Sequence, residues 1–315
     1  MESLFCKVYI SAYSLMPISN QSSINDFDVL LEYLDNFILG HKCYNNIHIE
    51  CTNDIFDYEI EGNSLEYILL EILNFDYGIY SHYLSELQKI VGEFVKYNNT
   101  LCVKNKIISY SDDVPLLIPV FNNRKKIWGD LELIKHTSSI CETLKINSDY
   151  VAVNSKSEEE FIDLCKKNYI FLDFHDDIAD TLKTIKIGRY LNYINLITHS
   201  LNVLNQAYSL ISTEANKNLD DLNEIMILSD KLGKRLECTR QSKNKVEWEF
   251  QVSQEISLNK KETVNCEYHL KIDEMDDGRE IPRGLGNPVR IYFGLKTYKE
   301  FERKKFKIAH IGMHL

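Results

Sequence analysis

Hydrophobic and polar residues recur with two different periods along the chain. Near the N-terminus, the segments Leu4–Ala12 and Asn46–Cys51 carry the apolar content and alternation of strands. Between them, apolar residues at three-and-four spacing from Phe27 to Ile38 predict an amphipathic helix, which Asn25 or Asp26 is placed to cap. This mixture predicts an α/β N-terminal unit.

The middle of the chain is mainly helical in pattern. Tyr150–Val153 and Tyr169–Leu172 read as buried strands on either side of a helix capped by Ser157, which predicts a βαβ element. From Ile178 to Ile211 the apolar residues keep helical spacing, as one long helix or a kinked pair. A further helical pattern over Leu219–Leu236 is expected to fold back on it as a central helical hairpin.

After this hairpin the period changes to two, which is typical of strands with one buried face. Four strands are predicted, over Val246–Val252, Val264–Ile272, Val289–Phe293 and Phe306 to about Met313. They predict a small C-terminal antiparallel sheet. The expected fold class is therefore α+β, with regions at residues 1–148, 149–242 and 243–315.

Charge is distributed unevenly over the 315 residues, whose net charge is -11. Residues 243–315 contain 14 Lys and Arg against 12 Asp and Glu, whereas the remainder contains 22 against 35. This asymmetry favours nucleic acid, RNA more than DNA, as a partner of the C-terminal region, and a protein partner for the acidic N-terminal region. A homo-oligomer is also compatible with the broad apolar stripes of the central helices.

The chain has no apolar run of signal or membrane-spanning length, and its eight cysteines are scattered without paired ligand spacing. These features predict a cytoplasmic protein with reduced thiols and no membrane partner.

Proton-transfer and anion-binding side chains gather on the polar face of the predicted C-terminal sheet. One strand offers Glu267, His269 and Lys271, and the next offers Arg290 and Tyr292. Histidine exchanges protons near neutral pH, and Arg and Lys hold a phosphate and its developing charge. These residue types suit a metal-independent ribonuclease. The alternative is a sheet face with structural ion pairs such as Glu267 with Arg290.

The register of the last strand decides whether two more histidines join this face. If Ala309, Ile311 and Met313 face the core, His310 and His314 lie on the polar face. If Phe306 and Ile308 face the core, they do not. The pattern leaves both registers open.

The run from Pro288 to Phe293, followed by a charged turn and the run from Lys307 to Leu315, resembles the closing strands of RelE-like ribonuclease toxins. It is also similar to the tails of proteins from bacterial mobile and defence loci. The resemblance covers about a tenth of the chain. It implies phosphate binding and orientation by Arg290, Tyr292 and Lys271, and an antiviral defence or toxin–antitoxin setting.

Two other arrangements are candidate sites. His310 and His314 have the spacing of two zinc ligands on a helix, but a glycine between them disfavours a helix and no third ligand follows from spacing. The run His175-Asp176-Asp177 follows a buried strand, where it caps the next helix or binds Mg²⁺ with a substrate phosphate. No phosphate-binding loop, dinucleotide fingerprint, nucleophile elbow or zinc-protease motif is present, so we expect no cofactor or metal.

Two functions follow as hypotheses. The first is a ribonuclease-like effector acting in bacterial defence or a toxin–antitoxin-type system, with His269, Lys271, Arg290, Tyr292, His310 and Glu267 as candidate catalytic residues. The second is a non-catalytic protein-binding subunit or sensor of a defence assembly.

Overall fold

The computed structural model describes residues 4–15, 23–60, 62–96, 98–109, 114–119, 135–241, 247–252, 260–281, 289–298 and 303–315. The chain divides into two compact units, residues 1–147 and 148–315, and the division falls inside helix α6, Ile140–Asn154. The predicted α+β class is confirmed, because the first unit contains a parallel sheet and the second a mainly antiparallel sheet beside helices. The segments 149–242 and 243–315 lie together in the second unit.

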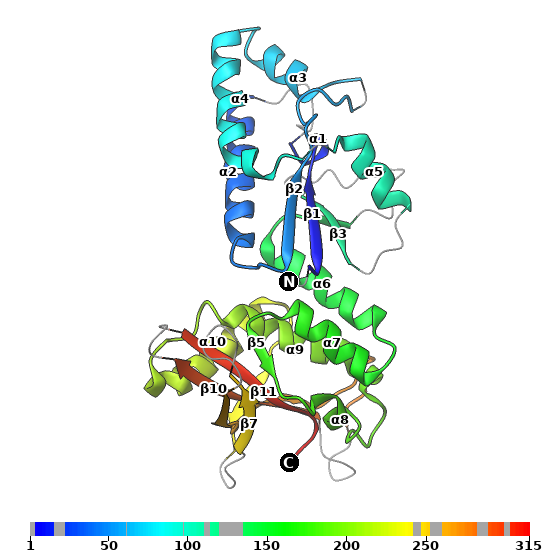
Figure 1. The fold of residues 1–315 in the computed structure, drawn as a ribbon, viewed down its shortest axis with the longest axis vertical. Coiled ribbons are helices and arrows are strands. Elements are labelled where there is room, and N and C mark those ends of the chain that lie inside the picture. Colours follow the sequence, from blue (N-terminus) through cyan, green and yellow to red (C-terminus); the bar gives the residue numbers. More distant parts are fainter. Residues whose placement is uncertain are drawn as a thin grey trace. The chain divides into compact units, whose positions relative to one another are not determined.

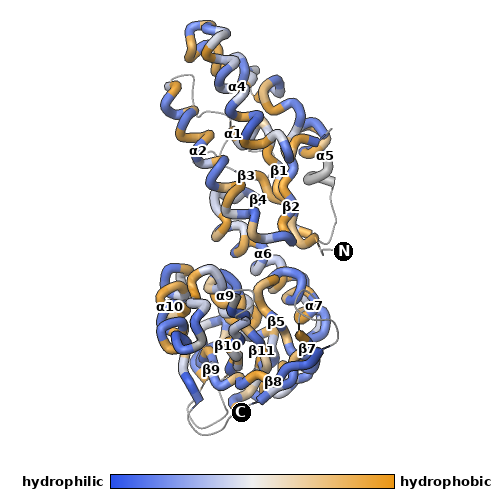
Figure 2. Tube along the Cα trace, turned by 60° about the vertical axis from the view of Figure 1, so that its left-hand side comes forward, coloured by the Kyte–Doolittle hydropathy of each residue, from blue (hydrophilic) through white to orange (hydrophobic). Residues whose placement is uncertain are grey.

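The N-terminal unit is a four-stranded parallel sheet with the strand order β2-β1-β3-β4. Figure 1 shows α2 and α4 to the left of this sheet and α5 to its right. Figure 2 shows the alternating hydropathy of α2, whose Phe27, Leu34 and Ile38 are buried. Its N-cap is Ser23, which forms a capping box with Asp26. The elements of this unit are β1 (Cys6–Ile10), α1 (Ala12–Leu15), α2 (Ile24–His41), β2 (Ile47–Cys51), α3 (Leu65–Ile72), α4 (Tyr77–Val91), α5 (Thr100–Ser109), β3 (Leu116–Pro119), β4 (Lys135–Thr137) and most of α6.

The C-terminal unit is built on a five-stranded sheet with the order β5-β11-β10-β9-β6, in which only the β5–β11 pair is parallel. A separate hairpin pairs β7 with β8. Helix α9 supplies much of the core, since twelve of its fourteen residues are buried, and α10 folds back against it as predicted. The elements are α7 (Glu158–Asn168), β5 (Leu172–Phe174), α8 (Ile178–Leu182), α9 (Ile194–Ala207), α10 (Asn218–Lys231), β6 (Glu237–Arg240), β7 (Glu247–Gln251), β8 (Lys261–Asn265), β9 (Tyr268–Ile272), β10 (Val289–Tyr298) and β11 (Arg303–Met313).

The two faces of the five-stranded sheet differ in chemistry. Residues that are directly opposite each other on neighbouring strands share a face, so the register assigns each side chain. One face is the core, where Leu270, Ile291 and Phe293 are buried. The other, which we call the polar face, carries His269 and Tyr292. The β7–β8 hairpin packs on the polar face at Gly294, where a Cβ would lie 2.7 Å from Cγ1 of Val264.

A β-bulge settles the register of the last strand. Tyr292 of β10 is opposite His310, but the next residue, Phe293, is opposite Ile308. Ala309 is therefore the extra residue, and its insertion reverses the alternation of β11 at that point. As a result, Ile308 and Ile311 both face the core, while His310 lies on the polar face. The register in which Phe306 and Ile308 face the core therefore holds before the bulge, and the register in which Ile311 faces the core and His310 the polar face holds after it.

The predicted βαβ element is wrong in its first strand. Residues 150–153 form the last turn of α6, not a strand. The buried positions of this helix recur every four residues as the pairs 143/144, 147/148 and 151/152. Several of them are polar, for example Thr143 and Asn147, which hid the helical period and left only a short apolar run visible. The following helix does begin after Ser157, whose Oγ accepts a hydrogen bond from the backbone N–H of Glu160.

Among the described residues, no helix combines the length and apolar character needed to cross a bilayer. All eight cysteines lie in the described part of the chain and are free thiols.

Candidate active site

Three strands bring the candidate residues of the C-terminal sheet together. In the register, Tyr292 of β10 lies opposite His269 on one side and His310 on the other. The centroid of the Tyr292 ring is 5.1 Å from that of His269 and 5.7 Å from that of His310. His314 completes the group, with its ring centroid 5.9 Å from that of His269 and 6.2 Å from that of Tyr292. We call these four residues, together with Arg290, the histidine cluster. Its members on β9, β10 and β11 are between 0 and 7% exposed.

His269 is held at one ring nitrogen only. Its Nε2 lies 2.9 Å from Oγ1 of Thr239 on β6, whereas no described residue hydrogen-bonds its buried Nδ1. Burial, with the nearby charges of Arg290, His314 and Lys271, lowers the pKa of His269 to about 4. The imidazole is therefore neutral at pH 7. In the tautomer that donates from Nε2 to Thr239, Nδ1 is a proton acceptor.

Arg290 and Tyr292 supply a cation and a proton donor beside this histidine. Nη1 of Arg290 donates to Oδ1 of Asp273 at 2.8 Å, and no described residue accepts a hydrogen bond from its buried Nε. Burial raises the pKa of Tyr292, so its hydroxyl stays protonated at neutral pH. This hydroxyl accepts a hydrogen bond from the backbone N–H of Leu315. The cluster thus combines a base, an acid and a fixed positive charge.

Glu267 and Lys271 lie outside the cluster. The carboxylate of Glu267 pairs with Nε of Arg240 at 3.0 Å, so the expected ion pair between Glu267 and Arg290 is wrong. Nζ of Lys271 pairs with Glu237 on the neighbouring strand β6 at 2.8 Å. Lys271 is directly opposite Arg290 and is partly exposed, which places its ammonium at the rim of the cluster.

His310 is anchored within the strand end. Its Nε2 lies 2.8 Å from the carbonyl oxygen of Met313, and burial lowers its pKa. Because His310 and His314 lie on and just after a strand, they do not have the one-turn helical geometry of a zinc pair. The described part of the chain contains no group of three or more His, Cys, Asp or Glu side chains arranged to hold a metal.

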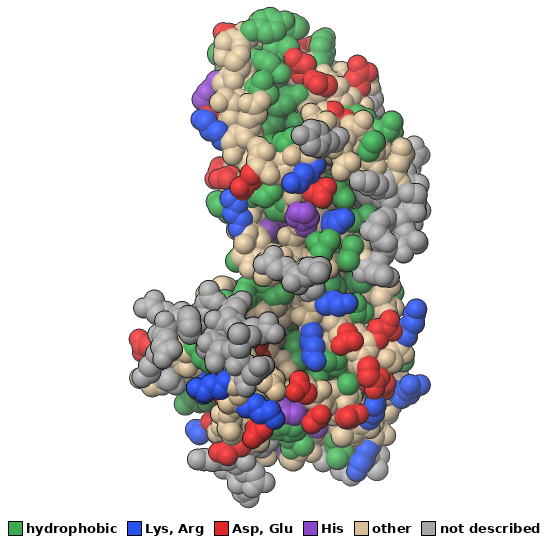
Figure 3. Space-filling view, viewed as in Figure 1, with side chains coloured by type: hydrophobic (Ala, Val, Ile, Leu, Met, Phe, Trp, Pro, Cys, Tyr) green, Lys and Arg blue, Asp and Glu red, His purple; other side chains and the backbone are tan. Residues whose placement is uncertain are grey.

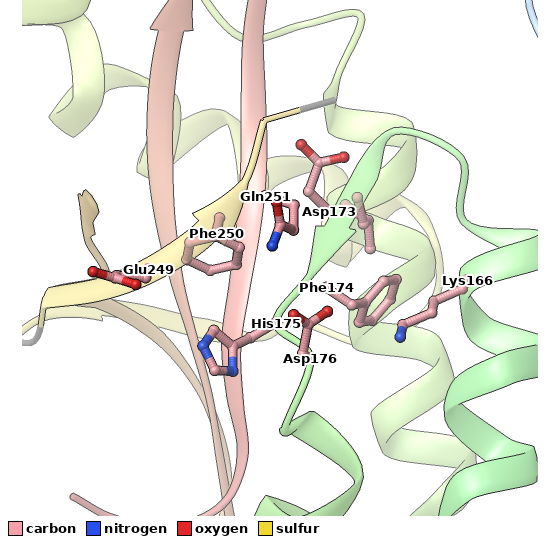
Figure 4. Close-up of a pocket in the computed structure, with 9 residues that line it drawn as sticks. Lys166, Asp173, Phe174, His175, Asp176, Glu249, Phe250 and Gln251 are labelled. Atoms are coloured by element: carbon pink, nitrogen blue, oxygen red, sulfur yellow. The ribbon is translucent and has the colours of Figure 1, made fainter. Parts of the chain in front are cut away.

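The second candidate segment, His175-Asp176-Asp177, borders a cavity of about 230 Å³ that we call the β5–β7 pocket. Figure 4 shows this pocket between β5, β7 and α7. The predicted capping role holds only by position: Asp177 is the N-cap residue of α8, but its side chain makes no capping hydrogen bond. Instead, its backbone N–H donates to Nδ1 of His175 at 3.2 Å.

A buried ion network lies beside the pocket on the polar face. Nζ of the fully buried Lys307 is 2.8 Å from Oδ2 of Asp173 and 2.7 Å from Oε1 of Glu262. Burial alone would lower the pKa of Lys307, but the charge of Asp173 and hydrogen bonds to both carboxylates raise it above its ordinary value. Lys307 therefore stays charged, and the network holds β11 to β5 and β8.

Comparisons of the chain with protein-family models, curated proteins and solved structures found no match. The resemblance of the last strands to RelE-like toxins therefore stays a prediction.

Sequence reasoning missed the partners that position the cluster. Asp273 had a signal, because it follows Lys271 by two residues and so continues the same strand face. Thr239 had none, because it lies in no predicted helix or strand, and the structure places it in β6. Lys166 and Gln251 of the pocket had no signal either, because they lie about 85 residues apart in the sequence.

Proposed function

We propose that the C-terminal unit is a metal-independent ribonuclease of a bacterial defence or toxin–antitoxin-type system, acting in the cytoplasm. The observation that supports this best is the neutral His269, whose buried Nδ1 has no hydrogen-bond partner among the described residues, beside Arg290 and a protonated Tyr292. RNA cleavage without metal needs a base for the 2′-hydroxyl, an acid for the leaving 5′-oxygen and a cation for the phosphorane. The cluster contains one group of each kind.

In the proposed reaction, Nδ1 of His269 takes the proton of the 2′-hydroxyl while the 2′-oxygen forms a bond to phosphorus. Arg290 stabilises the negative charge of the phosphorane. Tyr292 gives its proton to the 5′-oxygen as the P–O5′ bond breaks. The products are a 2′,3′-cyclic phosphate and a 5′-hydroxyl. Because the cluster is buried, the substrate has to enter at its rim, where Lys271 is partly exposed and where His314 and Leu315 contact Tyr292.

The distribution of charged side chains on the surface limits how RNA would bind. Figure 3 shows acidic and basic side chains intermixed on the visible face of the C-terminal unit. A protein that coats RNA uses broad positive fields. We therefore propose local contacts to one or a few phosphates, with Lys271 at the rim as one of them.

The test is incubation of the purified full chain with labelled single-stranded RNA of mixed sequence in EDTA. We expect cleavage by the wild type and by the control His82→Ala, a substitution of an exposed histidine on α4. His269→Gln should lose about a hundredfold or more in rate, because the amide can keep the hydrogen bond to Thr239 but cannot act as a base. No cleavage by a folded wild type, or equal rates for His269→Gln, would contradict the proposal.

The burial of the histidine cluster also favours the second candidate, a non-catalytic binding subunit. The N-terminal unit has an exposed group of large apolar side chains near the turn between α3 and α4, formed by Tyr67, Phe75, Tyr77 and Ile79. Phe75 has φ of 61°, a conformation that bulky residues rarely adopt. Exposed apolar groups of this kind mark protein contacts. Under this alternative the cluster only stabilises the sheet, and a protein partner binds at the α3–α4 turn.

A further inference from the structure

The β5–β7 pocket has the side chains of a base-binding site, and it is separate from the histidine cluster. Two of the rings that line it, His175 and Phe250, lie edge-on to each other with centroids 5.5 Å apart, and Trp248, which is not on the lining, lies edge-on to His175 at 4.9 Å. The backbone hydrogen bond from Asp177 fixes the His175 ring and places the ring proton on Nε2. Phe174 also lines the cavity. Aromatic and histidine rings of this kind stack single, unpaired bases in RNA-binding proteins.

The polar side chains of the pocket include both the hydrogen-bond donors and the acceptors that recognition of a base edge needs. Lys166 comes from α7 on one side, Gln251 from β7 on the other, and Asp176 from the end of β5 (Figure 4). No described residue forms a hydrogen bond or ion pair with the side chains of these three, whereas Asp173 is already engaged by Lys307. Glu249 points away from them in Figure 4. The available set is one ammonium, one carboxylate and one amide.

This set matches guanine better than the other bases. The O6 and N7 acceptors of guanine pair with a lysine ammonium, and its N1–H and N2–H donors pair with a carboxylate. A phosphate is a poor ligand, since carboxylates outnumber the single lysine on the lining. The cavity of about 230 Å³ is also below the ~300–1,000 Å³ of pockets that enclose whole drug-sized ligands, which suits one planar ring system.

We propose that the β5–β7 pocket binds a single guanine base, with Lys166 at O6 and N7 and Asp176 at N1–H and N2–H. Both a guanine of an RNA strand and a free guanine nucleotide have this chemistry. The assignment to RNA rests on the proposed function, because the pocket and the histidine cluster belong to the same unit. Binding of the base itself can be tested without any cleavage.

Trp248 gives the experiment a reporter, since it contacts His175 at the pocket. Trp128, the only other tryptophan, lies outside the described residues and is removed by Trp128→Phe. In this background we would titrate guanosine, GMP, adenosine and cytidine and follow the fluorescence of Trp248. We expect saturable quenching by guanosine and GMP, at least about tenfold tighter than by adenosine or cytidine. Absence of saturable quenching by guanosine, or equal affinity for all four, would overturn the proposal.

Asp176→Asn tests the carboxylate, and Asp163→Asn, at an exposed position of α7 with no ion pair among the described residues, is its control. We expect the first to weaken guanosine binding about tenfold and the second to leave it unchanged. Equal affinity of Asp176→Asn and wild type would contradict the assignment.

The two sources of guanine, an RNA strand and a free nucleotide, can be distinguished with two 2′-O-methyl oligonucleotides, one with a single guanine among uridines and one with uridines only. Neither oligonucleotide can undergo 2′-hydroxyl attack, so binding is measured without cleavage. Tighter binding of the guanine-containing strand than of GMP identifies RNA as the ligand, and tighter binding of GMP identifies a free nucleotide. If guanosine binds but RNA is not cleaved, the pocket stands and the ribonuclease proposal fails. If RNA is cleaved but guanosine does not bind, the ribonuclease proposal stands and the proposal for the pocket fails.

Discussion

Protonation of His269 should make the stability of the protein depend on pH in a defined window. Its folded-state pKa is about 4, below the ordinary value of 6.5, because burial and nearby positive charges disfavour the imidazolium. The unfolded chain therefore binds this proton more readily, and stability rises with pH across the window. The stabilising contribution is complete above pH 6.5 and is lost as the pH falls through about 4. At about 1.4 kcal/mol for each pKa unit, the full effect is about 3 kcal/mol.

Urea unfolding of wild type and His269→Gln between pH 7.5 and pH 3.5 measures this contribution. We expect the difference in unfolding free energy between the two proteins to shrink by about 3 kcal/mol as the pH falls. His41, whose pKa is also lowered to about 4 by burial, contributes equally to both proteins and cancels. His82→Gln, at an exposed site, serves as the matched control and should show no such trend. A difference that is constant with pH would refute the assignment of a neutral, buried His269.

Three further substitutions test the packing that positions the site. Lys304→Met leaves Asp221 buried without its cation and should cost about 3–5 kcal/mol of unfolding free energy. The double variant Lys304→Met with Asp221→Leu should restore part of this loss. An unchanged midpoint in urea for the single variant would contradict a stabilising ion pair between Lys304 and Asp221. Gly294→Ala forces the β7–β8 hairpin off the polar face and should cost about 1–3 kcal/mol, whereas Gly92→Ala, with no atom of the described residues within 4 Å of the added Cβ, should cost nothing measurable by thermal melting. Thr181→Val removes the hydroxyl that bonds both the N–H and the carbonyl of Ile311, and should lower unfolding free energy by about 1–3 kcal/mol; a neutral result would show that α8 does not secure β11.

The elements with a clean period were predictable from sequence. The alternation over Val289–Phe293 placed Arg290 and Tyr292 on one face, and β10 has that arrangement. The single strand predicted over Val264–Ile272 was wrong, because the chain leaves β8 at Asn265 and enters another sheet at Tyr268. Alternation continues through this break, so periodicity alone does not reveal it.

The arrangement of the cluster depended on features that no local pattern contains. The bulge at Ala309 places His310 beside Tyr292, and it arises from pairing with β10 rather than from the local sequence. The ion pair of Glu267 also depends on strand pairing: Glu267 pairs with Arg240 because β6 adds to the sheet beside β9, and this strand lacked a sequence signal. Arg290 pairs instead with Asp273, which directly follows β9.

The chemical nature of the ends produced from RNA in EDTA tests the catalytic role of the histidine cluster most directly. We expect the wild type to leave 2′,3′-cyclic phosphate and 5′-hydroxyl ends, and RNA with a 2′-deoxy sugar at the cleaved position to be resistant. We also expect His269→Gln to produce these ends at least about a hundredfold more slowly. Ends with a 5′-phosphate, cleavage that needs added Mg²⁺, or equal rates for wild type and His269→Gln would contradict a catalytic role of the histidine cluster.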